Sequence, residues 1–135
     1  MRKMGLDIGT VRIGIALSDP LKILASGYET YHCKNRAEDL MHIQKIVEEK
    51  QVEEIVVGNP LNFDGTNSKM TEYVKLFCED LKKTTLAKIV LQDERLTSLE
   101  AEEILVSQNV SREKRKELID KVAATIILQS YLNLK

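Results

Sequence analysis

Cysteine is scarce in this chain, which has only Cys33 and Cys78 in 135 residues. The two cysteines lie far apart and lack the paired spacing of zinc ligands, so we expect reduced thiols rather than a disulfide, a zinc site or redox chemistry. Long apolar runs are also absent, and no segment approaches the roughly 20 residues that a membrane-spanning helix needs. We therefore expect a soluble protein with no membrane partner.

Neither charge sign is in excess, since the formal net charge is −1 and the sequence pI is about 6.2. The chain as a whole thus lacks the basic surplus typical of nucleic-acid-binding proteins. One segment differs locally: REKRKELIDK, residues 112–121, is rich in lysine and arginine. Such a stripe either contacts phosphates or forms a solvated helix face with ion pairs. The N-terminus MRKMGLDIG lacks the features of a signal peptide, which favours a cytoplasmic location.

Hydrophobic periodicity predicts a single α/β domain over residues 1–135. A tight hairpin and a third strand open the chain, and strands then alternate with helices. This order predicts a mixed five-stranded sheet with helices on both faces. In chain order we expect strands at residues 4–10, 12–19 and 23–31, a helix at 36–50, a strand at 53–58, a helix capped by Asn67 or Ser68, a strand at 88–92, a helix at 99–108 with a capping box of Thr97 and Glu100, and a last helix that begins at Ser111.

The first strand carries a carboxylate, Asp7, between two glycines, Gly5 and Gly9. These three residues share one face, and the hairpin adds Gly14 and other small residues beside them. A buried charge without a partner is costly, so Asp7 needs a cation, a metal ion or a ligand. Bare strands also indicate that another backbone approaches closely. Pairing of Asp7 with Arg12 or a nearby lysine, Lys3, is the purely structural alternative.

The last predicted helix supplies a second acid. Asp120 lies on or beside an apolar stripe whose small members, Ala123 and Ala124, would let the helix lie close to the sheet. Asp120 could then approach Asp7, although a solvated helix residue is the alternative. A third acid comes from QDER, where Asp93 and Glu94 would face opposite sides of a continuing strand, so only one of them can join Asp7.

Three converging carboxylates repel one another unless hard cations lie between them, which predicts Mg²⁺ or Mn²⁺. Two such ions about 3.5 to 4 Å apart can activate a water molecule and stabilise a leaving oxygen in phosphodiester hydrolysis. The sequence contains no evident Ser/His/Asp or Cys/His nucleophile arrangement, and we expect His32 and His42 to be surface residues.

Four segments resemble, in order and spacing, the motifs of the YqgF family of Holliday junction resolvase-like proteins: GLDIGTVRIGIALSD, VVGNPLNFDGT, DERLTSLEAE and IDKVAATIILQSYL. The resemblance implies a ribonuclease-H-like fold and a bacterial, cytoplasmic, metal-dependent nuclease that matures the 5′ end of precursor 16S ribosomal RNA. It also implies that the catalytic acids and metal ligands are Asp7, Glu94 and Asp120. One departure is Asn59, where the family usually has leucine.

We expect the substrate to be structured RNA or branched DNA. Arg12 and Arg95 could clamp phosphates, since a guanidinium suits bidentate contact, or could pair with neighbouring carboxylates. The turn-rich segment NPLNFDGTNS, residues 59–68, would line the nucleic-acid groove with Asn62, Asp64, Gly65 and Thr66. A junction resolvase makes paired cuts and would normally be a homodimer, whereas an RNA nuclease could be a monomer, and the sequence leaves this open.

Two other functions fit parts of the sequence. A non-catalytic RNA-binding module for ribosome assembly could use the same fold, because a fold does not determine function. DIGT also resembles the first phosphate loop of actin-like and sugar-kinase-like ATPases, but those enzymes close two domains over a nucleotide and this chain has room for one.

Overall fold

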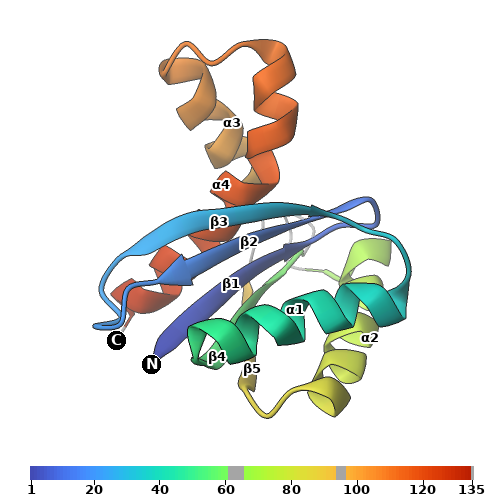
Figure 1. The fold of residues 1–135 in the computed structure, drawn as a ribbon. Coiled ribbons are helices and arrows are strands. Elements are labelled where there is room, and N and C mark those ends of the chain that lie inside the picture. Colours follow the sequence, from blue (N-terminus) through green and yellow to red (C-terminus); the bar gives the residue numbers. More distant parts are fainter. Residues whose placement is uncertain (61–65, 94–96, 135) are drawn as a thin grey trace.

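The computed structural model describes residues 1–60, 66–93 and 97–134, with the backbone alone for residues 97–99. Its elements follow the predicted order, three strands and then alternating helices and strands (Figure 1). They are β1 (Arg2–Ile8), β2 (Arg12–Ser18), β3 (Ala25–His32), α1 (Arg36–Lys50), β4 (Val52–Asn59), α2 (Lys69–Thr84), β5 (Lys88–Asp93), α3 (Thr97–Ser107) and α4 (Arg112–Asn133).

The five strands form one mixed sheet in the order β3-β2-β1-β4-β5. Tight turns join the first three strands, which are therefore antiparallel, whereas α1 and α2 are crossovers that make β1, β4 and β5 parallel. The mixed five-stranded sheet expected from the sequence is confirmed. The third strand was predicted from Ile23 but begins at Ala25, because the Asp19 carboxylate accepts the N–H groups of Ile23 and Leu24 and holds them in a turn.

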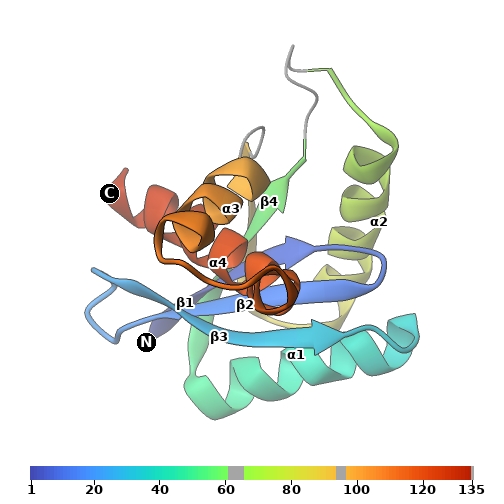
Figure 2. The ribbon, with the colours of Figure 1, turned by 90° about the horizontal axis from the view of Figure 1, so that it is seen from above.

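The two faces of the sheet differ in side-chain size. One face carries large aliphatic residues of β1 and β2, such as Leu6 and Ile15, which pack against α1 and α2. The other face carries small residues, including Ala16, and is covered by the C-terminal half of α4. Helices thus cover both faces, as expected. The α3–α4 hairpin rises away from the sheet (Figure 1), and seen from above α3 lies beside α4 (Figure 2).

Helix starts follow ordinary capping chemistry. The Ser68 side chain accepts the Thr71 N–H and Thr71 bonds back to the Ser68 N–H, so Ser68 rather than Asn67 caps α2. Ser111 caps α4 as predicted, by accepting the Lys114 N–H. The capping box proposed for Thr97 lies outside the described side chains.

Both cysteines are free thiols, as expected. Burial raises the pKa of Cys78 to about 11, which makes this thiol unreactive. His32 is exposed as expected, but His42 is half-buried, stacked on Tyr31 and bonded to Glu29. Over the described residues, no helix combines the length and the apolar character needed to cross a bilayer.

Candidate active site

Asp7 lies near the C-terminal end of β1 and is half-buried. Its partner across the antiparallel pair is Gly14 of β2, and the next pair on the same face is Gly5 with Ala16. Residues directly opposite in such a pair project from the same face, so the Asp7 side chain projects from the face that α4 covers. Small residues therefore lie beside Asp7, as predicted.

The glycines allow the backbone of α4 to rest directly on the sheet. A Cβ atom added to Gly14 would lie 1.9 Å from the carbonyl oxygen of Asp120, and one added to Gly5 would lie 2.7 Å from the carbonyl oxygen of Ala124. No side chain fits in either place. The close approach expected of the last helix is confirmed, and it brings Asp120 against the strand position opposite Asp7.

Gly9 has a different role from Gly5 and Gly14. Its N–H donates to the carbonyl oxygen of Arg12 at 2.9 Å, which closes the hairpin, and a Cβ atom at Gly9 would lie 2.7 Å from that same oxygen. Gly9 is therefore explained by the turn and not by the helix. Sequence alternation grouped it with the face of Asp7, but the close contacts of its missing Cβ are to the turn.

Asp120 is held by an ion pair. Its Oδ2 accepts a hydrogen bond from Arg12 Nε at 2.7 Å, and the Asp120 side chain is 20% exposed. It is therefore not a freely solvated helix residue. The pairing follows from geometry, because Arg12 and Gly14 are two residues apart on one strand and so share the face on which α4 lies.

The two bases considered as partners of Asp7 pair with other carboxylates. Lys3 forms an ion pair with Glu54, and Arg12 forms the ion pair with Asp120. The sequence suggested Arg12 as a partner for Asp7 or as a phosphate clamp, and did not anticipate its bond to an acid 108 positions later.

The register of β5 shows whether Asp93 of QDER can be the third acid. Asp93 pairs with Asn59 at the end of β5, without a register shift along the β4–β5 ladder. Val90 packs on the α4 face and Ile89 on the opposite face, so alternation places Asp93 on the face opposite to Asp7. Asp93 is therefore not the acid that joins Asp7.

The other predicted site residues divide between described and undescribed parts of the chain. Thr66 is described and exposed, just ahead of α2. Outside the described residues lie Glu94, Arg95, Asn62, Asp64 and Gly65. Within residues 1–60, 66–93 and 97–134, no three metal-ligating side chains of His, Cys, Asp or Glu form a cluster. The described part of the site is the pair of acids, Asp7 and Asp120, with Arg12.

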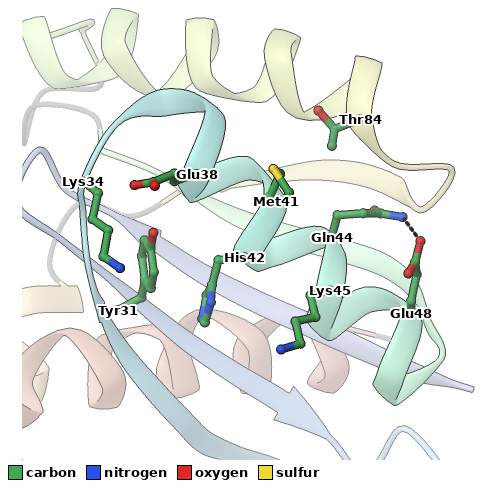
Figure 3. Close-up of a pocket in the computed structure, with 9 residues that line it drawn as sticks. All are labelled: Tyr31, Lys34, Glu38, Met41, His42, Gln44, Lys45, Glu48 and Thr84. Atoms are coloured by element: carbon green, nitrogen blue, oxygen red, sulfur yellow. Dashed lines mark hydrogen bonds between the residues drawn. The ribbon is translucent and has the colours of Figure 1, made fainter.

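A cavity of about 550 Å³ lies away from these acids, over α1 and the end of β3 (Figure 3). Two of its polar side chains, Tyr31 and His42, make structural contacts. The Tyr31 hydroxyl donates to buried Asp39 at 2.9 Å, and burial with that bond raises the pKa of Tyr31 to about 12. His42 bonds Glu29 Oε1 at 2.6 Å. A phenol that remains protonated up to this pH is a poor general base near neutral pH.

Comparison with known proteins gives one consistent result. A family model described as "RuvX: Holliday junction resolvase" matches residues 1–134. A protein from Carboxydothermus hydrogenoformans named "Putative pre-16S rRNA nuclease" is 46% identical over 135 residues, covering 100% of this chain and 98% of that protein. A protein of the same name from Halothermothrix orenii is 47% identical over 133 residues, covering 98% and 95%.

Among solved structures, T. thermophilus RuvC in complex with Holliday junction substrate superposes with a TM-score of 0.62 and 13% identity, covering 99% of this chain and 94% of that chain. At this identity the match concerns the fold alone. The ribonuclease-H-like fold expected from the sequence is confirmed.

Proposed function

The chain belongs to the RuvX family of nucleases, and we propose that it is a divalent-metal-dependent endonuclease that processes the 5′ end of precursor 16S ribosomal RNA. One observation carries the catalytic part of this proposal. The α4 backbone rests on Gly14, directly opposite Asp7, and so brings Asp120 to the same face of the sheet as Asp7. Two acidic residues from distant segments thus lie on one face of the sheet, and the contact that places α4 there has room only for glycine.

The residues fit hard divalent cations. Asp7 and Asp120 supply carboxylate oxygens, which Mg²⁺ and Mn²⁺ prefer over nitrogen or sulfur. Arg12 bonds Oδ2 of Asp120, and among the described residues no hydrogen bond is made to Oδ1. We propose Glu94 as the third ligand, because Asp93 lies on the other face and Glu94 is the remaining acid of QDER.

Each described residue has a distinct role in this mechanism. Divalent ions, when bound, activate water for attack on phosphorus and stabilise the leaving oxygen. Asp7, on a central strand, provides a ligand whose position is set by the sheet. Arg12 orients the Asp120 carboxylate through Nε, and its side chain is still 37% exposed, so its remaining N–H groups can contact a substrate phosphate. We propose that Arg95 and the loop residues Asn62, Asp64, Gly65 and Thr66 contact the substrate strand.

Branched DNA is the second candidate substrate. The family description names Holliday junction resolvases, and the fold matches a RuvC structure that holds a Holliday junction. Junction resolution needs two symmetric cuts and therefore a dimer, whereas processing one RNA end does not. The full-length relatives named for RNA favour RNA as the substrate of this chain.

The test is cleavage of precursor 16S ribosomal RNA and of a four-way DNA junction side by side, each with Mg²⁺ and with a chelator. We expect metal-dependent cutting near the mature 5′ end of the RNA. Cutting of the junction alone would replace RNA by DNA as the substrate. Salt-sensitive binding of RNA with no cleavage under any metal condition would favour a non-catalytic assembly module.

A further inference from the structure

A second feature of the α4 side is a cationic pocket of about 280 Å³, where the α3–α4 hairpin rises from the sheet (Figure 1). It brings together residues from β2, α3 and the first turns of α4. The pocket is lined by Arg12, Glu102, Arg112, Arg115, Lys116 and Ile119. Four of these are cations and one is an acid, so the cavity is strongly positive although the whole chain is nearly neutral.

Arg12 is paired with Asp120, but the three cations that α4 contributes to this pocket are not neutralised in the same way. A solvated helix face would show ion pairs between residues four positions apart. In the part of the chain that the structure describes, no ion pair involves Arg112, Arg115 or Lys116. Arg112 and Lys116 are instead two like charges at that spacing, which repel each other. An anion in the pocket would relieve this repulsion.

The position of the cations in α4 also opposes helix stability. The N-terminal end of a helix carries partial positive charge, so bases in the first turn raise its energy. Arg112 is the first residue of α4, the acid Glu113 follows it in the first turn, and Arg115 and Lys116 come within the next turn. Placing bases here disfavours the helix, and an anionic ligand would offset that cost.

The pocket is partly preorganised and adjoins the candidate active site. Arg115 is half-buried, and its Nη1 donates to the carbonyl oxygen of Val110 at 3.2 Å, which fixes the guanidinium against the α3–α4 turn. Arg12 lines the same pocket and bonds Asp120. The cations and the proposed metal-binding acids are therefore parts of one continuous surface.

We propose that Arg112, Arg115, Lys116 and Arg12 bind backbone phosphates of the substrate nucleic acid beside the bond that is cut. The proposal rests on the proposed nuclease function, because it places these contacts next to Asp120. Guanidinium groups match phosphate oxygens in bidentate geometry, which suits a backbone contact that does not read sequence.

The test uses the double variant R112Q/K116Q, whose two residues are exposed, so that folding is preserved. The control is K82Q/K83Q, an exposed lysine pair in the last turn of α2. Binding of a stem–loop RNA is measured in a chelator, without cleavage, at several salt concentrations. Each lost phosphate contact lowers the slope of log affinity against log salt by about 0.7 to 0.9. We expect R112Q/K116Q to bind about tenfold more weakly, with the slope reduced by about 1.5, and its melting temperature not to fall.

Several results would overturn the proposal. One is unchanged affinity and salt slope in R112Q/K116Q, and another is an equal loss in K82Q/K83Q, which would mean that only overall charge matters. A third arm measures binding of inorganic phosphate: loss of phosphate binding with unchanged RNA binding would assign the pocket to a free anion instead. Because cleavage is not part of the readout, a wild-type protein that binds RNA through this pocket but never cuts would contradict the nuclease function and leave the pocket intact.

Discussion

Replacing Gly14 by alanine tests the contact that joins α4 to the strand opposite Asp7. The new Cβ would lie 1.9 Å from the Asp120 carbonyl oxygen and 2.3 Å from its carbonyl carbon, whereas real Cβ contacts essentially never fall below 3.0 Å. Both atoms are backbone and cannot rotate away. The helix must therefore move outward by about 1 Å or more at Asp120, away from a second close contact at Gly5.

The expected cost follows from this geometry. Overpacking a well-packed contact typically costs about 1 to 3 kcal/mol, and we expect the upper end here because a whole helix must shift. About 3 kcal/mol corresponds to a melting temperature lower by about 10 °C for a domain of this size. Cleavage should fall further, by about 100-fold, since a shift of about 1 Å in a reacting group has that effect.

The matched control is Gly27→Ala on the edge strand β3. A Cβ atom there would lie 2.6 Å from Cγ of Lys121, a flexible side chain that can move aside. We expect G27A to cost less than about 1 kcal/mol and to keep its cleavage activity. Thermal melts and single-turnover cleavage of both variants provide the comparison. A G14A protein as stable and as active as G27A would refute the idea that this glycine positions Asp120.

Three further predictions concern stability. Asp120→Asn removes a partly exposed ion pair with Arg12 and should lower the free energy of unfolding by less than about 1 kcal/mol, measured by circular dichroism; a much larger loss would mean that Asp120 is mainly structural. Asn59→Leu removes a buried amide oxygen that has no hydrogen-bond partner among the described residues, and should raise the free energy of unfolding in urea by about 1 kcal/mol. A decrease would contradict this interpretation. The pKa of Tyr31 is raised to about 12, so above about pH 10 the folded state binds more protons than the unfolded state, and the free energy of unfolding should fall as pH rises. Tyr31→Phe should show a weaker fall, and a pH profile identical to that of wild type would contradict the raised pKa.

The sequence predicted those features that depend on local pattern. The alternation around Asp7 and the short hairpin predicted that Gly14 lies beside Asp7 on one face, and the structure adds that the two residues are directly opposite. The stripe containing Ala124 likewise predicted which side of α4 meets the sheet. Both inferences use periodicities of about two and 3.6 residues, which are properties of single elements.

Features that depend on the exact seating of distant elements were not predictable. The bond between Arg12 and Asp120 joins residues 108 positions apart and depends on where along the strand the helix rests. The face of Asp93 required the register of β5 against β4, which the sequence does not encode in any short segment. The cationic pocket was visible only as a basic segment, because its cavity exists only once α4 meets β2 and α3.

The most direct test of the central claim is Mn²⁺ binding, followed by the electron paramagnetic resonance signal of the free ion, in wild type and in the variants D7N, D120N and D80N. Asp80, on α2, is the matched control because it also forms an ion pair with an arginine. Its carboxylate lies 2.6 Å from Arg36, and that of Asp120 lies 2.7 Å from Arg12. If Asp7 and Asp120 share one divalent-ion site, D7N and D120N should each bind Mn²⁺ at least about tenfold more weakly, while D80N binds like wild type. Wild-type affinity in either D7N or D120N would contradict the claim that these two acids form the metal site.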